Sequence, residues 1–205
     1  ADGPAGETVA VDLLDRAAVL AQAPRLAGVT HVFLATRLPG RTPAEESDAN
    51  LAALVNLMDA LEPAAGGLRH VCLVHGTKWY GSHLGPYALP AREDHPRHMP
   101  PNFYHAQHDF IRDRQAGKAW TWSTLRPHTV WGQNRGTGNS LVTAIGVYAS
   151  ISKALGLPLR FPGPPETYAK VSQGVTATLL AEAMEWAATT PDCAGQTFNV
   201  TNGDV

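Results

Sequence analysis

Apolar runs of strand length alternate with amphipathic segments along most of the chain. Residues 30–36 form an almost continuous apolar run, and residues 68–76 and 120–132 predict two further strands. Such runs are typical of strands that are buried on both faces, as in a parallel sheet. Between the first two runs, residues 43–62 predict a helix. Its apolar face consists of Leu51, Leu54, Val55, Met58 and Leu61.

Weaker signals complete the order of elements. Residues 8–15 predict a short strand, and residues 15–27 predict a helix that is broken near Pro24. Asn102 can cap a further helix that precedes the strand at 120–132. The remaining expected elements are helices at 140–156 and 171–189 and a last strand at 196–200. This alternation favours an α/β fold with a parallel sheet and helices on both faces.

Composition excludes several classes of protein. Among the 205 residues, 44% are apolar and 17% are charged, which is typical of a globular domain. The net charge of −2 gives no basic footprint for nucleic acid, and no apolar run is long enough to predict a membrane span. Cys72 and Cys193 have no metal-binding or redox spacing, so we expect a reducing, cytoplasmic setting.

Candidate chemistry lies where the predicted strands end. Ligands of open parallel sheets bind beyond the carboxyl ends of the strands. Lys78 follows one strand in "HGTKWYG", and Tyr104 opens the helix before the next strand in "PPNFYHAQHD". A nearby lysine favours the phenolate and lowers the pKa of a tyrosine, and a tuned phenol can stabilise a developing oxyanion. The pair therefore suits hydride transfer from a nicotinamide. His105 and His108 share a helical face, but two ligands do not make a metal site.

These segments resemble a known family. The run from "HGTKWYG" through "PAREDHPRHMPPNFYHAQHD" is similar to the progesterone 5β-reductase/iridoid synthase-like group of the short-chain dehydrogenase/reductases. That group carries the segments TGxKxY, ED-x-PR and NFYYxxED. "TLRPHTVWG", "VYASISKALGLPLRFPG" and "FNVTNGDV" resemble its downstream blocks, so the resemblance covers nearly the whole chain.

The resemblance implies an NADPH-dependent reductase of C=C bonds conjugated to a carbonyl, with NADH left open. Tyr104 would stabilise the enolate oxygen, and Lys78 would support that site and the cofactor. Ordinary short-chain dehydrogenases place their lysine four residues after the tyrosine, where this chain has His108. The expected partner is a small carbonyl or enone substrate, and a homodimer is left open.

The family also implies contact residues, carried over position by position. The expected cofactor contacts are Asp12 and Leu13 at the adenine, Ala35 and Thr36 alongside the cofactor, Gly76, Thr77, Lys78 and Tyr104 at the nicotinamide side, and Pro127, Thr129 and Val130 at the carboxamide. Trp79, Tyr80 and Tyr87 are expected in the substrate wall.

The implied fold is a Rossmann-like parallel sheet with flanking helices and a small C-terminal substrate lobe. We expect a partial dinucleotide-binding region at 1–132 and mixed substrate-lobe and terminal Rossmann segments at 133–205, integrated in one domain. The usual N-terminal Gly-rich βα unit is lacking before Asp12. A chain of this length alone would expose apolar sheet edges, and we therefore expect part of a longer enzyme.

Other departures put the substrate in question. His105 replaces the second tyrosine of NFYY, His108–Asp109 replaces its ED pair, and Arg37 replaces the family's tryptophan after the second strand. Two alternatives stay open. One is a sugar-nucleotide epimerase/dehydratase-like enzyme of the same superfamily, and the other is a non-catalytic, Rossmann-like binding protein.

Overall fold

A four-stranded parallel sheet organises the computed structural model, which describes residues 6–132 and 141–203. The spatial order is β1-β2-β3-β6. The strands are β1 (His31–Leu34), β2 (His70–Val74), β3 (Thr121–Pro127) and β6 (Gln196–Val200). All three pairings are parallel, which confirms the α/β fold with a parallel sheet.

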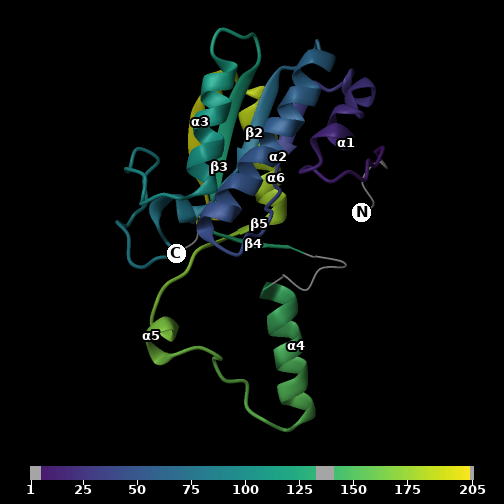
Figure 1. Ribbon diagram of the computed structural model, residues 1–205. Helices are drawn as coiled ribbons and strands as arrows, with labels where there is room; N and C mark the ends of the chain where they lie inside the picture. The colour runs from purple at the N-terminus through teal and green to yellow at the C-terminus, as the bar shows by residue number, and fades with distance from the viewer. Residues whose placement is uncertain (1–5, 133–140, 204–205) are drawn as a thin grey trace.

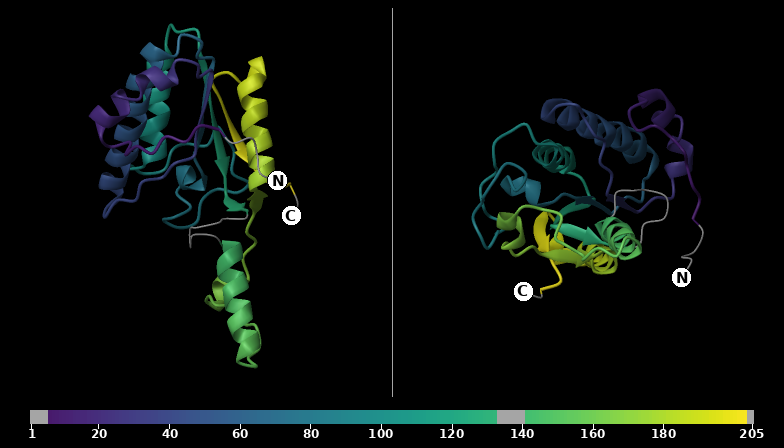
Figure 2. Two further views of the ribbon diagram at one scale, coloured as in Figure 1. Left: turned by 90° about the vertical axis from the view of Figure 1, so that its right-hand side faces the viewer. Right: turned by 90° about the horizontal axis from the view of Figure 1, so that it is seen from below.

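Helices cover both faces of this sheet. α2 (Pro43–Ala64) and α3 (Phe103–Gln115) lie on one face, and α6 (Ala177–Thr189) lies on the other (Figures 1 and 2). α1 (Arg16–Leu20) packs outside α2. Three short 3₁₀ helices complete this part: η1 (Ala23–Leu26), η2 (Thr77–Tyr80) and η3 (Pro191–Cys193).

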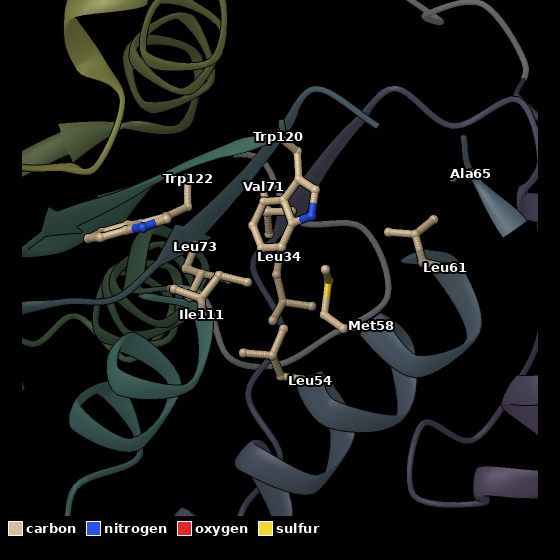
Figure 3. Packing of buried hydrophobic residues seen from close by; sticks show 10 residues of the cluster. All are labelled: Leu34, Leu54, Met58, Leu61, Ala65, Val71, Leu73, Ile111, Trp120 and Trp122. Carbon is tan, nitrogen blue, oxygen red and sulfur yellow. The ribbon is translucent and has the colours of Figure 1, made fainter. Parts of the chain in front are cut away.

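The main core lies between the sheet and the helices α2 and α3 (Figure 3). It contains Leu34, Leu54, Met58, Leu61, Ala65, Val71, Leu73, Ile111, Trp120 and Trp122. α2 begins because the Thr42 side chain accepts a hydrogen bond from the Glu45 amide and because Pro43 occupies its first turn. Each fully buried leucine contributes about 1.5–3 kcal/mol, so this cluster anchors the strands whose ends carry the candidate chemistry.

A smaller lobe extends beyond the carboxyl ends of the sheet. It contains a parallel pair, β4 (Thr129–Trp131) and β5 (Gly174–Thr176), and the helices α4 (Leu141–Ala154) and α5 (Pro165–Tyr168). α4 stands away from the main sheet in Figure 1, and its apolar side chains are about half exposed. β6 then returns to pair with β3, so residues from both predicted regions share one sheet.

Three sequence predictions of local structure are wrong. Residues 8–15 form no strand, since no neighbouring strand pairs with them in the described part of the chain. The strand predicted at 120–132 divides at His128 into β3 and β4, which belong to different sheets. The helix predicted at 171–189 begins only at Ala177, because Gly174–Thr176 forms β5 and Thr176 caps the helix that follows.

The edge strand β1 exposes apolar surface, as predicted. Phe33 is 46% exposed although it lies within a strand. A hollow of about 560 Å³ lies beside it, between β1 and α6, and is lined by His31, Phe33, Met184 and Ala188 among others. None of the predicted site residues lines this hollow. Among the described helices, none has the length and apolar character needed to cross a membrane.

Candidate active site

Tyr104 lies in the first turn of α3, at the carboxyl end of β2. A Cβ atom at Gly76 would lie 3.2 Å from the Tyr104 hydroxyl oxygen and 3.3 Å from the carbonyl oxygen of Pro127. The absence of a side chain at Gly76 therefore leaves room for the phenol to approach the ends of β2 and β3. The structure thus brings together three of the predicted residues, Gly76, Tyr104 and Pro127.

Asn102 connects the segments that carry Lys78 and Tyr104. Its side-chain oxygen accepts a hydrogen bond from the Tyr104 amide at 3.0 Å, which caps α3. Its side-chain nitrogen donates to the Lys78 carbonyl oxygen at 2.8 Å. Among the described residues, no hydrogen bond joins the Lys78 ammonium to the Tyr104 hydroxyl. The two residues are instead held near each other through the buried Asn102.

The phenol of Tyr104 does not have the lowered pKa that we expected. Burial raises the pKa of Tyr104 to about 12, while the positive charge of Arg37 opposes this rise and the negative charge of Glu46 adds to it. Arg37 and Glu46 form an ion pair in which Nε and Oε1 are 2.6 Å apart. Lys78 is not among the charges that shift this pKa. The phenol therefore stays protonated at neutral pH and acts as a hydrogen-bond donor.

Lys78 lines a small hollow of about 50 Å³ together with Glu46, His83 and Asn102. Burial, followed by the positive charge of Lys78, lowers the pKa of His83. Both Lys78 and Glu46 therefore place their charges near the start of α3. This hollow is much smaller than the one beside β1, but its lining includes Lys78, one of the predicted site residues.

A layer of aromatic and basic residues lies beneath this site. The Arg126 guanidinium lies 3.7 Å from the centroid of the Trp79 ring, and Arg126 donates a hydrogen bond to the Tyr80 hydroxyl at 2.9 Å. Trp79 and Tyr80 are each only 4% exposed. Both residues, which were expected in the substrate wall, are therefore buried in this structure. Tyr87, the third residue predicted there, is half-buried and stacks on Tyr80.

His75 is part of the same layer. Its ring lies beside Tyr104, with centroids 4.8 Å apart, and is stacked over Trp79. Burial lowers the pKa of His75 well below its usual value, and the nearby Arg126 lowers it further. Gln107 favours the protonated form, but no hydrogen bond to either ring nitrogen of His75 is formed within the described residues. His75 is therefore a neutral packing partner of Tyr104.

A profile of the PRISE-like Rossmann-fold domain matches residues 10–204. The chain belongs to this family.

Curated relatives agree with that assignment. An (S)-8-oxocitronellyl enol synthase of Nepeta cataria is 36% identical over 204 residues, which cover 96% of this chain and 51% of the relative. A 3-oxo-Δ(4,5)-steroid 5β-reductase of Arabidopsis thaliana is 36% identical over 192 residues, or 88% of this chain and 48% of the relative. The chain spans about half the length of the curated relatives that it matches.

Solved structures show the same fold at lower identity. RMD from Pseudomonas aeruginosa, complexed with NADPH, superposes with a TM-score of 0.73 at 19% identity, covering 100% of this chain and 71% of that one. A UDP-glucose 4-epimerase from Thermotoga maritima, with UDP-glucose, gives a TM-score of 0.71 at 16% identity, covering 95% of this chain and 62% of that one. Both structures share the general architecture of the PRISE-like domain.

The residues expected at the nicotinamide side lie close together in this PRISE-like domain. The Tyr104 hydroxyl and the Pro127 carbonyl approach Gly76 so closely that a Cβ atom there would crowd both. β3 ends at Pro127, and Thr129 and Val130 follow directly in β4. Thr77 begins η2, where its hydroxyl accepts a hydrogen bond from Ser82. These residues are the candidates for contact with the nicotinamide end of a dinucleotide.

The adenine end of the predicted cofactor site has fewer of the expected features than the nicotinamide end. Asp12 is exposed and accepts a hydrogen bond from the Leu14 amide at 2.9 Å, as in a local turn. The Leu13 carbonyl is held by the Asn56 side chain. Ala35 and Thr36 are exposed directly after β1. In the described residues, no glycine-rich turn leads into a helix here, so the PRISE-like domain shows no phosphate cradle at this end.

No group of three His, Cys, Asp or Glu residues in the described ranges could hold a metal ion. Sequence reasoning assigned no site role to Asn102, Arg37, Glu46 or His75. In the sequence, Asn102 was recognised only as a helix cap, and Arg37 was recognised only as a departure from the family pattern. Asn102 gains its further role from a contact between distant segments, since its side chain also donates to the Lys78 carbonyl.

Proposed function

We propose that this PRISE-like domain forms part of a nicotinamide-dependent reductase of enones. The observation that carries the proposal is the position of the Tyr104 hydroxyl at the carboxyl ends of β2 and β3, close to Gly76 and the Pro127 carbonyl, where burial raises the pKa of the phenol. The names of its relatives, an enol synthase and a steroid 5β-reductase, support the same class of reaction.

Tyr104 would act as the hydrogen-bond donor to the carbonyl oxygen of the substrate. Conjugate addition converts that carbonyl into an enolate, so negative charge grows on the oxygen during the reaction. A donor that is fixed in advance stabilises this charge more than it stabilises the neutral ketone. The raised pKa of Tyr104 keeps its proton available for this bond at neutral pH.

Lys78 would supply positive charge to the same region, with its backbone fixed by Asn102. Gly76, Thr77, Pro127, Thr129 and Val130 would hold the nicotinamide end of the cofactor. A reduced nicotinamide, when bound there, supplies a hydride to the β-carbon of the enone. We infer NADPH as the preferred cofactor from the family resemblance, and comparison of the KM values for NADPH and NADH tests that preference.

The test is turnover of a neutral cyclic enone, followed as loss of nicotinamide absorbance. Tyr104→Phe should lower kcat/KM by about 10²-fold, the typical effect of removing one oxyanion donor. The matched control is Tyr168→Phe, which removes a phenolic hydroxyl from the exposed face of α5. Equal rates for Tyr104→Phe and the unaltered chain would contradict the role of Tyr104.

Two alternatives predict other outcomes. An epimerase-like enzyme would turn over a sugar nucleotide, but the position four residues after Tyr104 is His108 rather than the lysine expected of that mechanism. A non-catalytic binding protein would neither bind NADPH nor oxidise it in the presence of an enone. A lack of both binding and turnover would overturn the proposed reductase function.

A further inference from the structure

The loop after β1 holds Arg37 in a fixed position at the carboxyl end of the sheet. Asn50 of α2 is 1% exposed and forms two hydrogen bonds with the neighbouring Leu38. Its side-chain oxygen accepts from the Leu38 amide at 2.8 Å, and its nitrogen donates to the Leu38 carbonyl at 2.7 Å. Asn50 therefore holds both the amide and the carbonyl of Leu38, the residue that follows Arg37.

The same arrangement extends to the helix that carries Tyr104. Gln107 lies three residues after Tyr104 on α3 and donates a hydrogen bond to the Asn50 carbonyl at 3.0 Å. On the other side, a Cβ atom at Gly40 would overlap the backbone of Glu46, so the loop packs tightly against the start of α2. The loop, α2 and α3 consequently form one hydrogen-bonded unit.

The charges in this unit do not cancel. Arg37 uses its Nε atom to bind Glu46, while its two terminal nitrogens form no hydrogen bond with the other described residues. The Arg37 side chain is 51% exposed, so these nitrogens are open to solvent. Lys78 lines the small hollow together with Glu46. Around Glu46, two cations and one carboxylate therefore leave a net charge of one positive unit.

We propose that Arg37 is a specificity-determining residue that binds a carboxylate group of the substrate while Tyr104 binds its ketone oxygen. This inference rests on the proposed enone reductase function and narrows its substrate to conjugated ketones that carry a carboxylate, such as 4-oxo-2-enoates. A guanidinium presents a planar pair of N–H donors that matches the two oxygens of a carboxylate. A carboxylate carries a single negative charge, which matches the net charge of the site better than a phosphate does.

Binding to an unreactive product analogue tests the inference without turnover. The probes are 4-oxo-4-phenylbutanoate and its neutral amide, each titrated into the full chain and followed by the nitrogen-15 NMR signal of the Arg37 Nε–H group. We expect the acid to bind about tenfold more tightly than the amide, the size of effect typical of a charge-assisted hydrogen bond at a half-exposed site. Arg37→Gln should abolish this preference.

Arg41→Gln provides the matched control. Arg41 lies in the same loop and pairs with Glu45, but its side chain is 91% exposed, so its removal should leave the preference for the acid unchanged. Equal binding of the acid and the amide to the unaltered chain would overturn the inference, and so would a preference that survives Arg37→Gln. If Arg37→Gln weakens NADPH binding and leaves acid binding unchanged, Arg37 serves the cofactor and the inference is wrong.

The proposed function and this inference fail in different ways. Turnover of a neutral enone by the unaltered chain, without any preference for a carboxylate, would refute only the role of Arg37. Failure to bind either probe, together with failure to oxidise NADPH with a neutral enone, would refute both. In turnover, Arg37→Gln should raise KM for the keto acid about tenfold, whereas the control Arg41→Gln should leave that KM unchanged.

Discussion

Replacement of Asn102 should separate the two roles of its side chain. Asn102→Ala removes the cap of α3, at a cost of about 1 kcal/mol. It also removes the hydrogen bond to the Lys78 carbonyl, to which the Gly81 amide still donates, at a further cost of about 1 kcal/mol. The free energy of unfolding should therefore fall by about 2 kcal/mol, which lowers the melting temperature of a domain of this size by about 4–8 °C.

Asn102→Asp distinguishes the cap from the link to Lys78. The aspartate can still accept a hydrogen bond from the Tyr104 amide, and its negative charge is favourable at the start of a helix. It cannot donate to the Lys78 carbonyl. We therefore expect Asn102→Asp to lose roughly 1 kcal/mol of stability, about half the loss of Asn102→Ala, and yet to lose turnover to a similar extent because Lys78 is released.

Urea unfolding, followed by tryptophan fluorescence, gives the two stabilities, and nicotinamide absorbance gives the rates. Thr176→Ala serves as a reference for the loss of a simple cap, because Thr176 accepts only the Leu179 amide through its hydroxyl. If Asn102→Ala is no less stable than Thr176→Ala, the link to Lys78 contributes nothing to stability. Normal turnover by Asn102→Asp would show that this link does not position Lys78.

Two further predictions follow from single positions. Gly76→Ala should reduce turnover much more than stability, as measured by the same two assays. The added Cβ would crowd the Tyr104 hydroxyl at 3.2 Å and the Pro127 carbonyl at 3.3 Å. A fully active variant would show that turnover does not depend on the close approach of these groups to Gly76. His70 is buried between Thr121 and Ser123, and burial lowers its pKa from 6.5 to about 4. The folded state therefore favours neutral His70, and stability should fall by roughly 3 kcal/mol as pH drops from 6.5 to 4, since the unfolded chain takes up a proton first. Urea unfolding at several pH values should show a shallower loss for His70→Gln, and an equal slope would contradict the assignment.

The elements best predicted from sequence are those whose burial can be inferred from their own apolar residues. β2 and β6 were expected because their apolar runs suit strands within a sheet, and α2 because one face of its sequence is apolar. β5 was missed, and β4 was not separated from β3, because β4 and β5 each have three residues and gain their hydrogen bonds from a partner about 45 positions away. No local periodicity encodes such a pairing. The segment at 8–15 has strand-like residues but no strand beside it, so its propensity was not sufficient.

The candidate site shows the same limit. Tyr104 and Gly76 were found through short segments that resemble the family, and the structure places them together. The pKa of Tyr104 was predicted with the wrong sign, because the strand-end positions of Lys78 and Tyr104 indicated that the two side chains share one cleft. The actual value depends on how deeply the phenol is buried and on the charges of Arg37 and Glu46, which come from a different loop and helix. Burial and long-range charge are properties of the folded chain.

The frame of the site consists of amide groups, whereas its chemistry depends on charged ones. Asn50 fixes the loop at Leu38, Gln107 joins α3 to Asn50, and Asn102 fixes the backbone of Lys78. Carboxamides do not titrate in the physiological range, so this frame keeps its geometry when pH changes. The cations and the carboxylate near Tyr104 can therefore respond to substrate or pH without loss of the frame. It follows that a charge-neutralising substitution in the site should change affinity and rate far more than it changes stability, whereas substitution of the three amides should change both.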